Sequence, residues 1–99
     1  QDFQDRELDE DAYLLMFFAA REGSGEAALA LAKKFDPATF KAGGLPGQAD
    51  ELQAHKWYGI AIEAGMLEAH SARQALRARV EQAAAAGDSR ARRIALQWN

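Results

Sequence analysis

The chain has no cysteine among its 99 residues, which excludes disulfide bonds and zinc sites built on thiolates. It has only two prolines, Pro37 and Pro46, so helices can form on both sides of this pair without a residue that breaks them. The longest uninterrupted apolar run, residues 12–20, is nine residues long, whereas a membrane-spanning helix needs roughly 20. No secretory signal opens the sequence. We therefore expect no membrane segment and no targeting signal, and the composition is compatible with the cytoplasm and the periplasm alike.

Apolar residues make up 48% of the chain, which is typical of a folded globular protein. Much of this content is alanine, whose small side chain favours close contacts between helices over a thick core. A chain of this length fits one compact domain. We therefore interpret residues 1–99 as a single domain.

The net charge of −3 conceals an uneven distribution. Residues 1–26 carry a net charge of −6, residues 27–66 are balanced, and residues 67–99 carry +3. One interpretation is that these charges lie on solvated helix surfaces, and that the acids near the start of the first helix complement its dipole. The other is that an acidic end and a basic end dock onto neighbouring proteins, or onto the next copy of the chain.

Apolar residues recur at the three-and-four spacing of helices over most of the chain, and no segment shows the two-residue alternation of strands. This spacing predicts about five helices, at residues 7–22, 25–35, 49–64, 67–86 and 89–97. The polar residues 1–6 are expected to be frayed. Because the connections are short, neighbouring helices should pair antiparallel in an all-α fold.

The first predicted helix is apolar over most of its circumference. Its main apolar face consists of Leu8, Ala12, Leu15, Met16, Ala19 and Ala20. Tyr13, Phe17 and Phe18 widen this face beyond one stripe. We therefore expect this helix to touch neighbours on more than one side.

Residues 36–48 form the clearest loop. Asp36 should end the second helix, since the residue before a proline is driven away from helical conformation, and residues 37–41 fit one further helical turn. The stretch Gly43-Gly44-Leu45-Pro46-Gly47 is rich in glycine, but it lacks the lysine and hydroxyl residue of a P-loop and follows no predicted strand. We interpret it as a connector rather than a phosphate-binding loop.

Three glycines share the same surroundings in the sequence. Four positions before Gly23, Gly65 and Gly87 stand Ala19, Ala61 and Ala83, and four positions after them stand Ala27, Ala69 and Ala91. Small residues beside a corner let two antiparallel helices approach closely. The helix–glycine–helix unit recurs after 42 and then after 22 residues, a self-similarity typical of stacked helical repeats.

The best-defined unit resembles the signature of Sel-one-like repeats, a branch of the tetratricopeptide-like α-solenoids. The residues that carry this resemblance are Ala54, Trp57, Tyr58, Ala61, Gly65 and Glu68-Ala69. In that family an alanine and the Trp-Tyr pair lie on the first helix, a glycine forms the corner, and a Glu-Ala pair opens the second helix. The second-helix pattern is better matched in the earlier copy, by Glu26-Ala27, Leu31-Ala32 and Phe35.

The resemblance implies a short right-handed solenoid that offers a surface to another protein. It divides the chain into a first repeat at residues 12–35, the loop, a second repeat at 49–86 and a capping helix at 87–99. The implied function is a non-catalytic protein-interaction or scaffold module in a larger bacterial regulatory or envelope protein. The alternative is a structural spacer or cap within a longer solenoid.

Residue types that carry catalysis or metal binding are sparse. His55 and His70 are the only histidines, and they lie on different predicted helices without the spacing of metal ligands. None of the three serines stands in a nucleophile-elbow context. We therefore predict no enzymatic activity, no metal site and no cofactor.

Six arginines lie in the last third of the chain, and they suggest nucleic-acid binding as a lower-ranked alternative function. The whole chain is acidic, so we expect a protein partner or self-association rather than a nucleic acid. Exposed arginines could also supply the polar outer face that terminal repeats need. The candidate interaction surface consists of Arg73, Arg77, Arg90 and Arg93.

Overall fold

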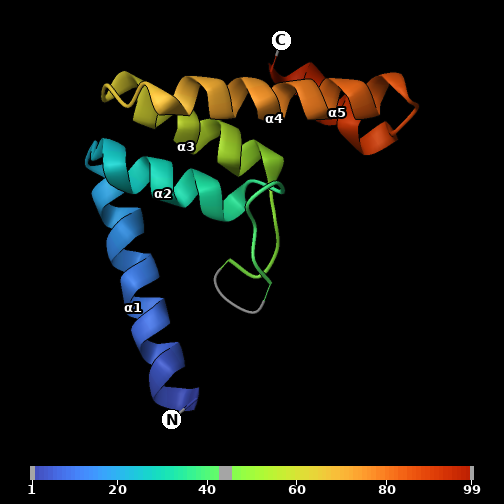
Figure 1. The fold of residues 1–99 in the computed structure, drawn as a ribbon. Coiled ribbons are helices and arrows are strands. Elements are labelled where there is room, and N and C mark those ends of the chain that lie inside the picture. Colours follow the sequence, from blue (N-terminus) through green and yellow to red (C-terminus); the bar gives the residue numbers. More distant parts are fainter. Residues whose placement is uncertain (1, 43–45, 99) are drawn as a thin grey trace.

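The computed structural model describes residues 2–42 and 46–98, with side chains from Glu10 onward. It contains five helices in chain order, α1 (Asp2–Arg21), α2 (Gly25–Phe35), α3 (Glu51–Glu63), α4 (Glu68–Ala85) and α5 (Ser89–Trp98) (Figure 1). These described segments contain no strand, so the all-α prediction is confirmed. The bounds of α2 to α5 lie within two residues of those predicted from the sequence.

The start of α1 differs from the prediction. The helix begins at Asp2, five residues before the expected start, so the frayed segment expected at residues 1–6 is helical from Asp2. Residues 2–21 contain neither glycine nor proline, and acidic residues near a helix N-terminus are stabilised by the helix dipole. The glycine-rich stretch interpreted as a connector is only partly described, because residues 43–45 lie outside the described residues.

Three helix ends share one geometry. Gly23, Gly65 and Gly87 have φ values of 100°, 96° and 105°, a conformation that glycine adopts without the strain of a side chain. At each corner the residue after the glycine donates its backbone N–H to the alanine five positions earlier, over 2.9–3.0 Å. The glycine N–H bonds the carbonyl three positions earlier. This pair of bonds is the Schellman motif, and the prediction of three glycine-terminated helices is confirmed.

Side-chain caps start three of the helices. Asp50 Oδ1 accepts from the backbone N–H groups of Leu52 and Gln53 at 3.0 and 3.2 Å and caps the start of α3. Asp88 Oδ1 accepts from the Ala91 N–H at 3.1 Å at the start of α5. Ser24 plays the same part for α2 through Ala27. Each cap satisfies backbone donors that have no partner inside the helix.

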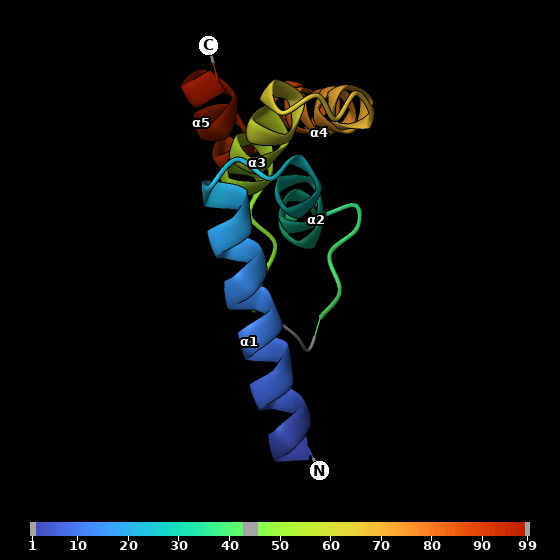
Figure 2. The same ribbon diagram turned by 90° about the vertical axis from the view of Figure 1, so that its left-hand side faces the viewer.

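Helices α2 to α5 run back and forth, each against its predecessor, but α1 departs from this pattern (Figures 1 and 2). Instead of lying alongside α2, α1 leaves the corner at a wide angle, so the antiparallel pairing expected for this pair is wrong. Tyr13 and Phe17 of α1 pack against the core cluster, and Phe17 contacts Trp57 of α3. The molecule is therefore elongated, with a radius of gyration of 14.4 Å against about 13 Å for a compact chain of this length.

The core lies where α2, α3 and α4 meet. Trp57 and Tyr58 are each 1% exposed and are the largest fully buried side chains of this core. Phe17 of α1 contacts the Trp57 ring edge-on, with 5.4 Å between ring centroids. Ala61 and Ala69 are completely buried beside the Gly65 corner, so helix contact there depends on small side chains.

The start of α2 packs tightly against the corner between α3 and α4. A Cβ atom placed on Gly25 would lie 2.6 Å from Met66 Cγ and 2.9 Å from Ala64 Cβ. Neither distance is compatible with normal van der Waals contact. Glycine at position 25 therefore allows α2 to approach this corner more closely than any other residue would.

Candidate functional site

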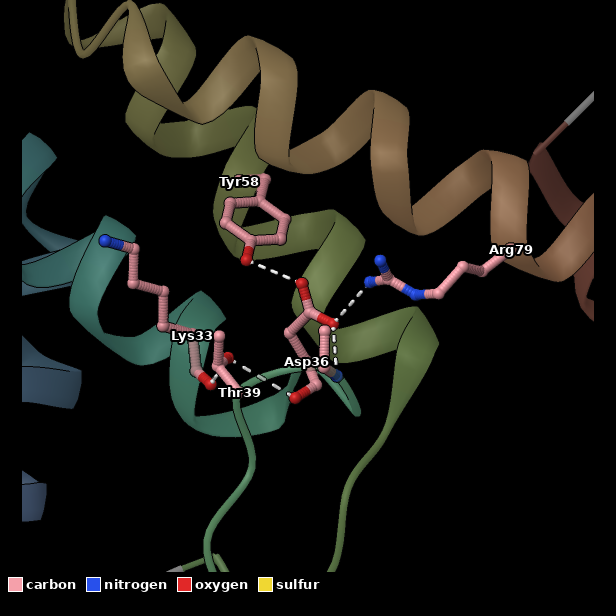
Figure 3. Close-up of polar contacts among 6 residues, drawn as sticks. Lys33, Asp36, Thr39, Tyr58 and Arg79 are labelled. Atoms are coloured by element: carbon pink, nitrogen blue, oxygen red, sulfur yellow. Dashed lines mark hydrogen bonds and ion pairs between the residues drawn. The ribbon is translucent and has the colours of Figure 1, made fainter.

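The most connected polar side chain is Asp36, at the end of α2 (Figure 3). The Tyr58 hydroxyl of α3 donates to Asp36 Oδ2 at 2.7 Å, and Arg79 Nη2 of α4 donates to Asp36 Oδ1 at 2.9 Å. The backbone N–H of Ala38 donates to the same Oδ1 at 2.9 Å. Asp36 is 3% exposed, and buried carboxylates need such partners. This network ties the loop after α2 to α3 and α4.

The backbone around Asp36 forms the extra turn predicted at residues 37–41. The N–H groups of Thr39 and Phe40 donate to the Asp36 carbonyl at 2.9 and 2.8 Å. The Thr39 hydroxyl also donates to the Lys33 carbonyl at the end of α2 (Figure 3). The turn therefore holds the carboxylate of Asp36 inward, towards α3 and α4.

This network stabilises the fold by joining three helices through buried hydrogen bonds. Burial of Tyr58, together with its hydrogen bond to Asp36, raises the pKa of its hydroxyl far above the ordinary value, so the phenol stays protonated. Both oxygens of the Asp36 carboxylate already accept hydrogen bonds. A carboxylate that already accepts three hydrogen bonds and a neutral phenol are poorly suited to acid–base catalysis at neutral pH.

A small groove of about 150 Å³ lies between α4, α5, the first residue of α3 (Glu51) and Pro37 after α2. Its walls are mostly apolar, and its rim carries Arg79, Arg90, Glu51 and Asp88. Arg90 forms a two-point contact with Glu51, at 2.8 and 3.2 Å, and this contact raises the pKa of the arginine. Arg79 is paired with Asp36. The rim charges therefore largely compensate one another.

His55 of α3 lies under Trp98 of α5, with the two rings stacked at a centroid distance of 4.4 Å. Burial and, to a smaller extent, the nearby Arg73 and Arg77 lower the pKa of His55. Its Nε2 atom is buried and has no hydrogen-bond partner among the described residues. Two arginines beside an imidazole oppose the binding of a metal cation. In the part of the chain that the structure describes, no group of three or more His, Asp or Glu side chains could hold a metal ion.

The four arginines chosen from the sequence do not gather on one free surface. Arg73 and Arg77 are half-buried, and their positive charges help to lower the pKa of His55. Arg90 is paired with Glu51. Arg93 is exposed on α5. Three of the four therefore interact with α3, and only Arg93 faces solvent without such a role.

The exposed apolar residues of α1 are the feature that the sequence interpretation placed wrongly. Leu14, Leu15 and Phe18 are 50%, 70% and 56% exposed, although Leu15 was assigned to the buried face. Ala12 is exposed too, and the side chain of Leu8 lies outside the described residues. The side that packs on the core consists of Tyr13, Met16, Phe17 and Ala20. The sequence shows that α1 has a second apolar side, but none of the helices that the structure describes covers it.

Acidic residues border this apolar face. At 100° per residue, Asp11 falls on the same side of α1 as Leu14, Leu15 and Phe18, and Glu10 lies one turn before Leu14. Glu22 follows the last residue of α1, and its backbone N–H still bonds the Phe18 carbonyl. Glu10, Asp11 and Glu22 are exposed. We call this set of exposed residues the α1 face. It combines an apolar centre with a border of three acids, and the exposed Arg21, three residues after Phe18, lies beside it over the Phe17 ring.

No protein-family model, no curated protein and no solved structure matches this chain. None of the helices, over the residues that the structure describes, is both long enough and apolar enough to cross a membrane. The resemblance to Sel-one-like repeats therefore rests on the chain's own residues. What the protein does has to follow from the surfaces that it presents.

Proposed function

We propose that this chain is a non-catalytic protein–protein interaction module that binds its partner through the α1 face. The observation that carries the proposal is the exposure of Leu14, Leu15 and Phe18, three large apolar side chains on one side of one helix. Clustered apolar side chains on a protein surface are typical of interaction sites. Their exposure costs free energy that a partner would recover by covering them.

The border of the α1 face defines the chemistry of the partner. Glu10, Asp11 and Glu22 would attract a basic segment, and the exposed side chains of a helix are matched by those of another amphipathic helix. The partner is therefore a helix with apolar residues on one side and arginine or lysine beside them. A nucleic acid would be repelled by the same acidic residues.

A module of the Sel-one-like, tetratricopeptide-like type accounts for the rest of the architecture. Its support is the identical hydrogen bonding at Gly23, Gly65 and Gly87 and the close contact of alanines beside Gly65. In this proposal the helix pairs form a short right-handed solenoid, and the network around Asp36 holds the pairs together.

A spacer within a longer solenoid is the second candidate. It is favoured by a large apolar residue on the last helix, Leu96, which is 73% exposed. A spacer would bury both the α1 face and α5 against neighbouring repeats of its own chain. It would then leave no free surface for a separate protein.

Photocrosslinking tests the interaction proposal. Leu15 is replaced by a benzophenone amino acid, and the matched control carries it at Gln74, an exposed position of α4. We expect adducts with one defined protein from Leu15 only. Leu15→Ser and Phe18→Ser should then weaken binding of that purified protein at least tenfold, and Gln74→Ser should not. Equal adducts at both positions, or binding that is unchanged in the serine variants, would overturn the proposal.

A further inference from the structure

The exposed side of α5 is the counterpart of the α1 face. Arg92, Arg93 and Leu96 are exposed and lie on the same side of the helix, and Arg92 Nε also donates to the Ala84 carbonyl at 3.3 Å. Leu96 is 73% exposed. We call this set the α5 face. It has an apolar side chain and two positive charges, which is the chemistry that the α1 face requires.

The two faces also share a spacing. On α1, Glu10 and Asp11 stand four residues before Leu14 and Leu15. On α5, Arg92 stands four residues before Leu96. If the two helices pack side by side in the same direction, acids lie opposite arginines and leucines lie opposite leucine. The reverse direction would place the acids against Leu96.

We propose that this chain associates head to tail with further copies of itself, the α1 face of one copy packing on the α5 face of the next. The inference rests on the proposed function and names the partner helix. The N-terminus of α1 lies at one end of the elongated molecule and α5 at the other (Figures 1 and 2). The residues of both faces are exposed in the single chain, so the contact would join separate copies.

Parallel pairing of like faces is disfavoured by the same charges. Two α1 faces packed in parallel would bring Glu10 and Asp11 against their own copies, and two α5 faces packed in parallel would oppose Arg92 and Arg93. A contact between two different faces leaves one of each free at the ends, so the assembly is open-ended unless its rotation closes a ring. We therefore expect growth beyond a dimer.

Sedimentation equilibrium of the purified chain, from micromolar to millimolar concentration, tests this inference. The weight-average mass should rise past twice the monomer mass of 10.8 kDa without levelling off at a dimer. High salt should lower the mass, because it screens exposed charges. A mass that stays monomeric, or a plateau at the dimer, would overturn head-to-tail association.

Charge reversal gives the decisive control. The double variants E10R/D11R and R92E/R93E should each be monomeric, because each then carries two faces of the same charge. An equimolar mixture should recover the high mass, since each face again meets its opposite. The matched variants E63R/E81R and K34E/K41E change exposed residues elsewhere by the same charge and should associate like the parent. Failure of the mixture to recover, with both variants folded by circular dichroism, would overturn the inference.

The outcome also separates this inference from the proposed function. If the purified chain is monomeric but still crosslinks through Leu15 to a different protein, self-association is wrong and the interaction module stands. If neither contact forms, both are wrong.

Discussion

Replacement of Asp36 by alanine should be among the most destabilising single changes in this protein. The substitution removes the acceptor of Tyr58, of Arg79 and of the Ala38 N–H. Tyr58 is 1% exposed, and a buried hydroxyl without a partner costs about 1–3 kcal/mol. The side chain of Arg79 is 45% exposed, so water can replace its lost contact and that pair contributes at most about 1 kcal/mol.

Together with the lost bond to Ala38, these contributions predict a loss of about 2–4 kcal/mol in the free energy of unfolding. In a domain of this size, the loss corresponds to a fall in Tm of roughly 10–25 °C. Tyr58→Phe removes one neutral donor to the carboxylate and should cost about 1 kcal/mol. In the double variant no buried hydroxyl is left without an acceptor, so its cost should be smaller than the sum of the single costs.

Urea denaturation followed by circular dichroism measures all three free energies, and a thermal scan gives Tm. Arg79→Ala removes only the partly exposed ion pair with Asp36 and serves as the control. It should lower the free energy of unfolding by less than Asp36→Ala does. The reasoning is refuted if Asp36→Ala costs less than about 1 kcal/mol. It is also refuted if the costs of Asp36→Ala and Tyr58→Phe simply add in the double variant, because the Asp36–Tyr58 hydrogen bond would then contribute nothing.

Two glycine substitutions should act in opposite directions. Gly25→Ala should destabilise the protein by about 1–3 kcal/mol through overpacking. Gly59→Ala, inside α3 where the added atom meets only ordinary contact, should stabilise it by about 0.5–1 kcal/mol. Urea melts that rank the two variants the other way would contradict the packing of α2 against the corner between α3 and α4. Ala61→Trp and Ala69→Trp should each cost at least about 1–3 kcal/mol, and parental melting of both would mean that the two alanines are not at a helix contact. The lowered pKa of His55 means that the unfolded chain binds a proton first as the pH falls below about 6.5. The contribution of His55 to the free energy of unfolding is then fully present above that pH and is lost as the pH falls below it. This loss should be smaller in His55→Gln. Equal pH profiles of the two proteins in urea denaturation would show that His55 titrates normally.

Local features of the sequence predicted the helices and their ends well. A glycine between two segments with helical spacing of apolar residues predicts that the first helix ends there. Gly23, Gly65 and Gly87 all end a helix in a Schellman motif. The Asp50 cap of α3 is a local feature as well, because the carboxylate bonds the N–H groups of Leu52 and Gln53 in the first turn of the helix. These features depend on residues within one or two turns of each other, so no tertiary information is needed to find them.

Asp36 was identified from the sequence only as the residue that ends α2. Its main partners, Tyr58 and Arg79, stand 22 and 43 residues further along the chain, and no local pattern joins them. Arg90 was likewise taken as a free surface charge, but packing of α5 places it beside Glu51. Contacts of this range depend on how helices are oriented.

The sequence by itself determined an all-helical chain, its five helices, its glycine corners and the unequal charge of its two ends, because these follow from spacing and composition. Only the tertiary structure decided which side of each helix is covered. Tyr13 and Phe17 face the core, so Leu14, Leu15 and Phe18 remain exposed, although both groups are equally apolar in the sequence. The hydrophobic effect favours burial of either side, and the direction in which α1 leaves its corner determines which one reaches the core.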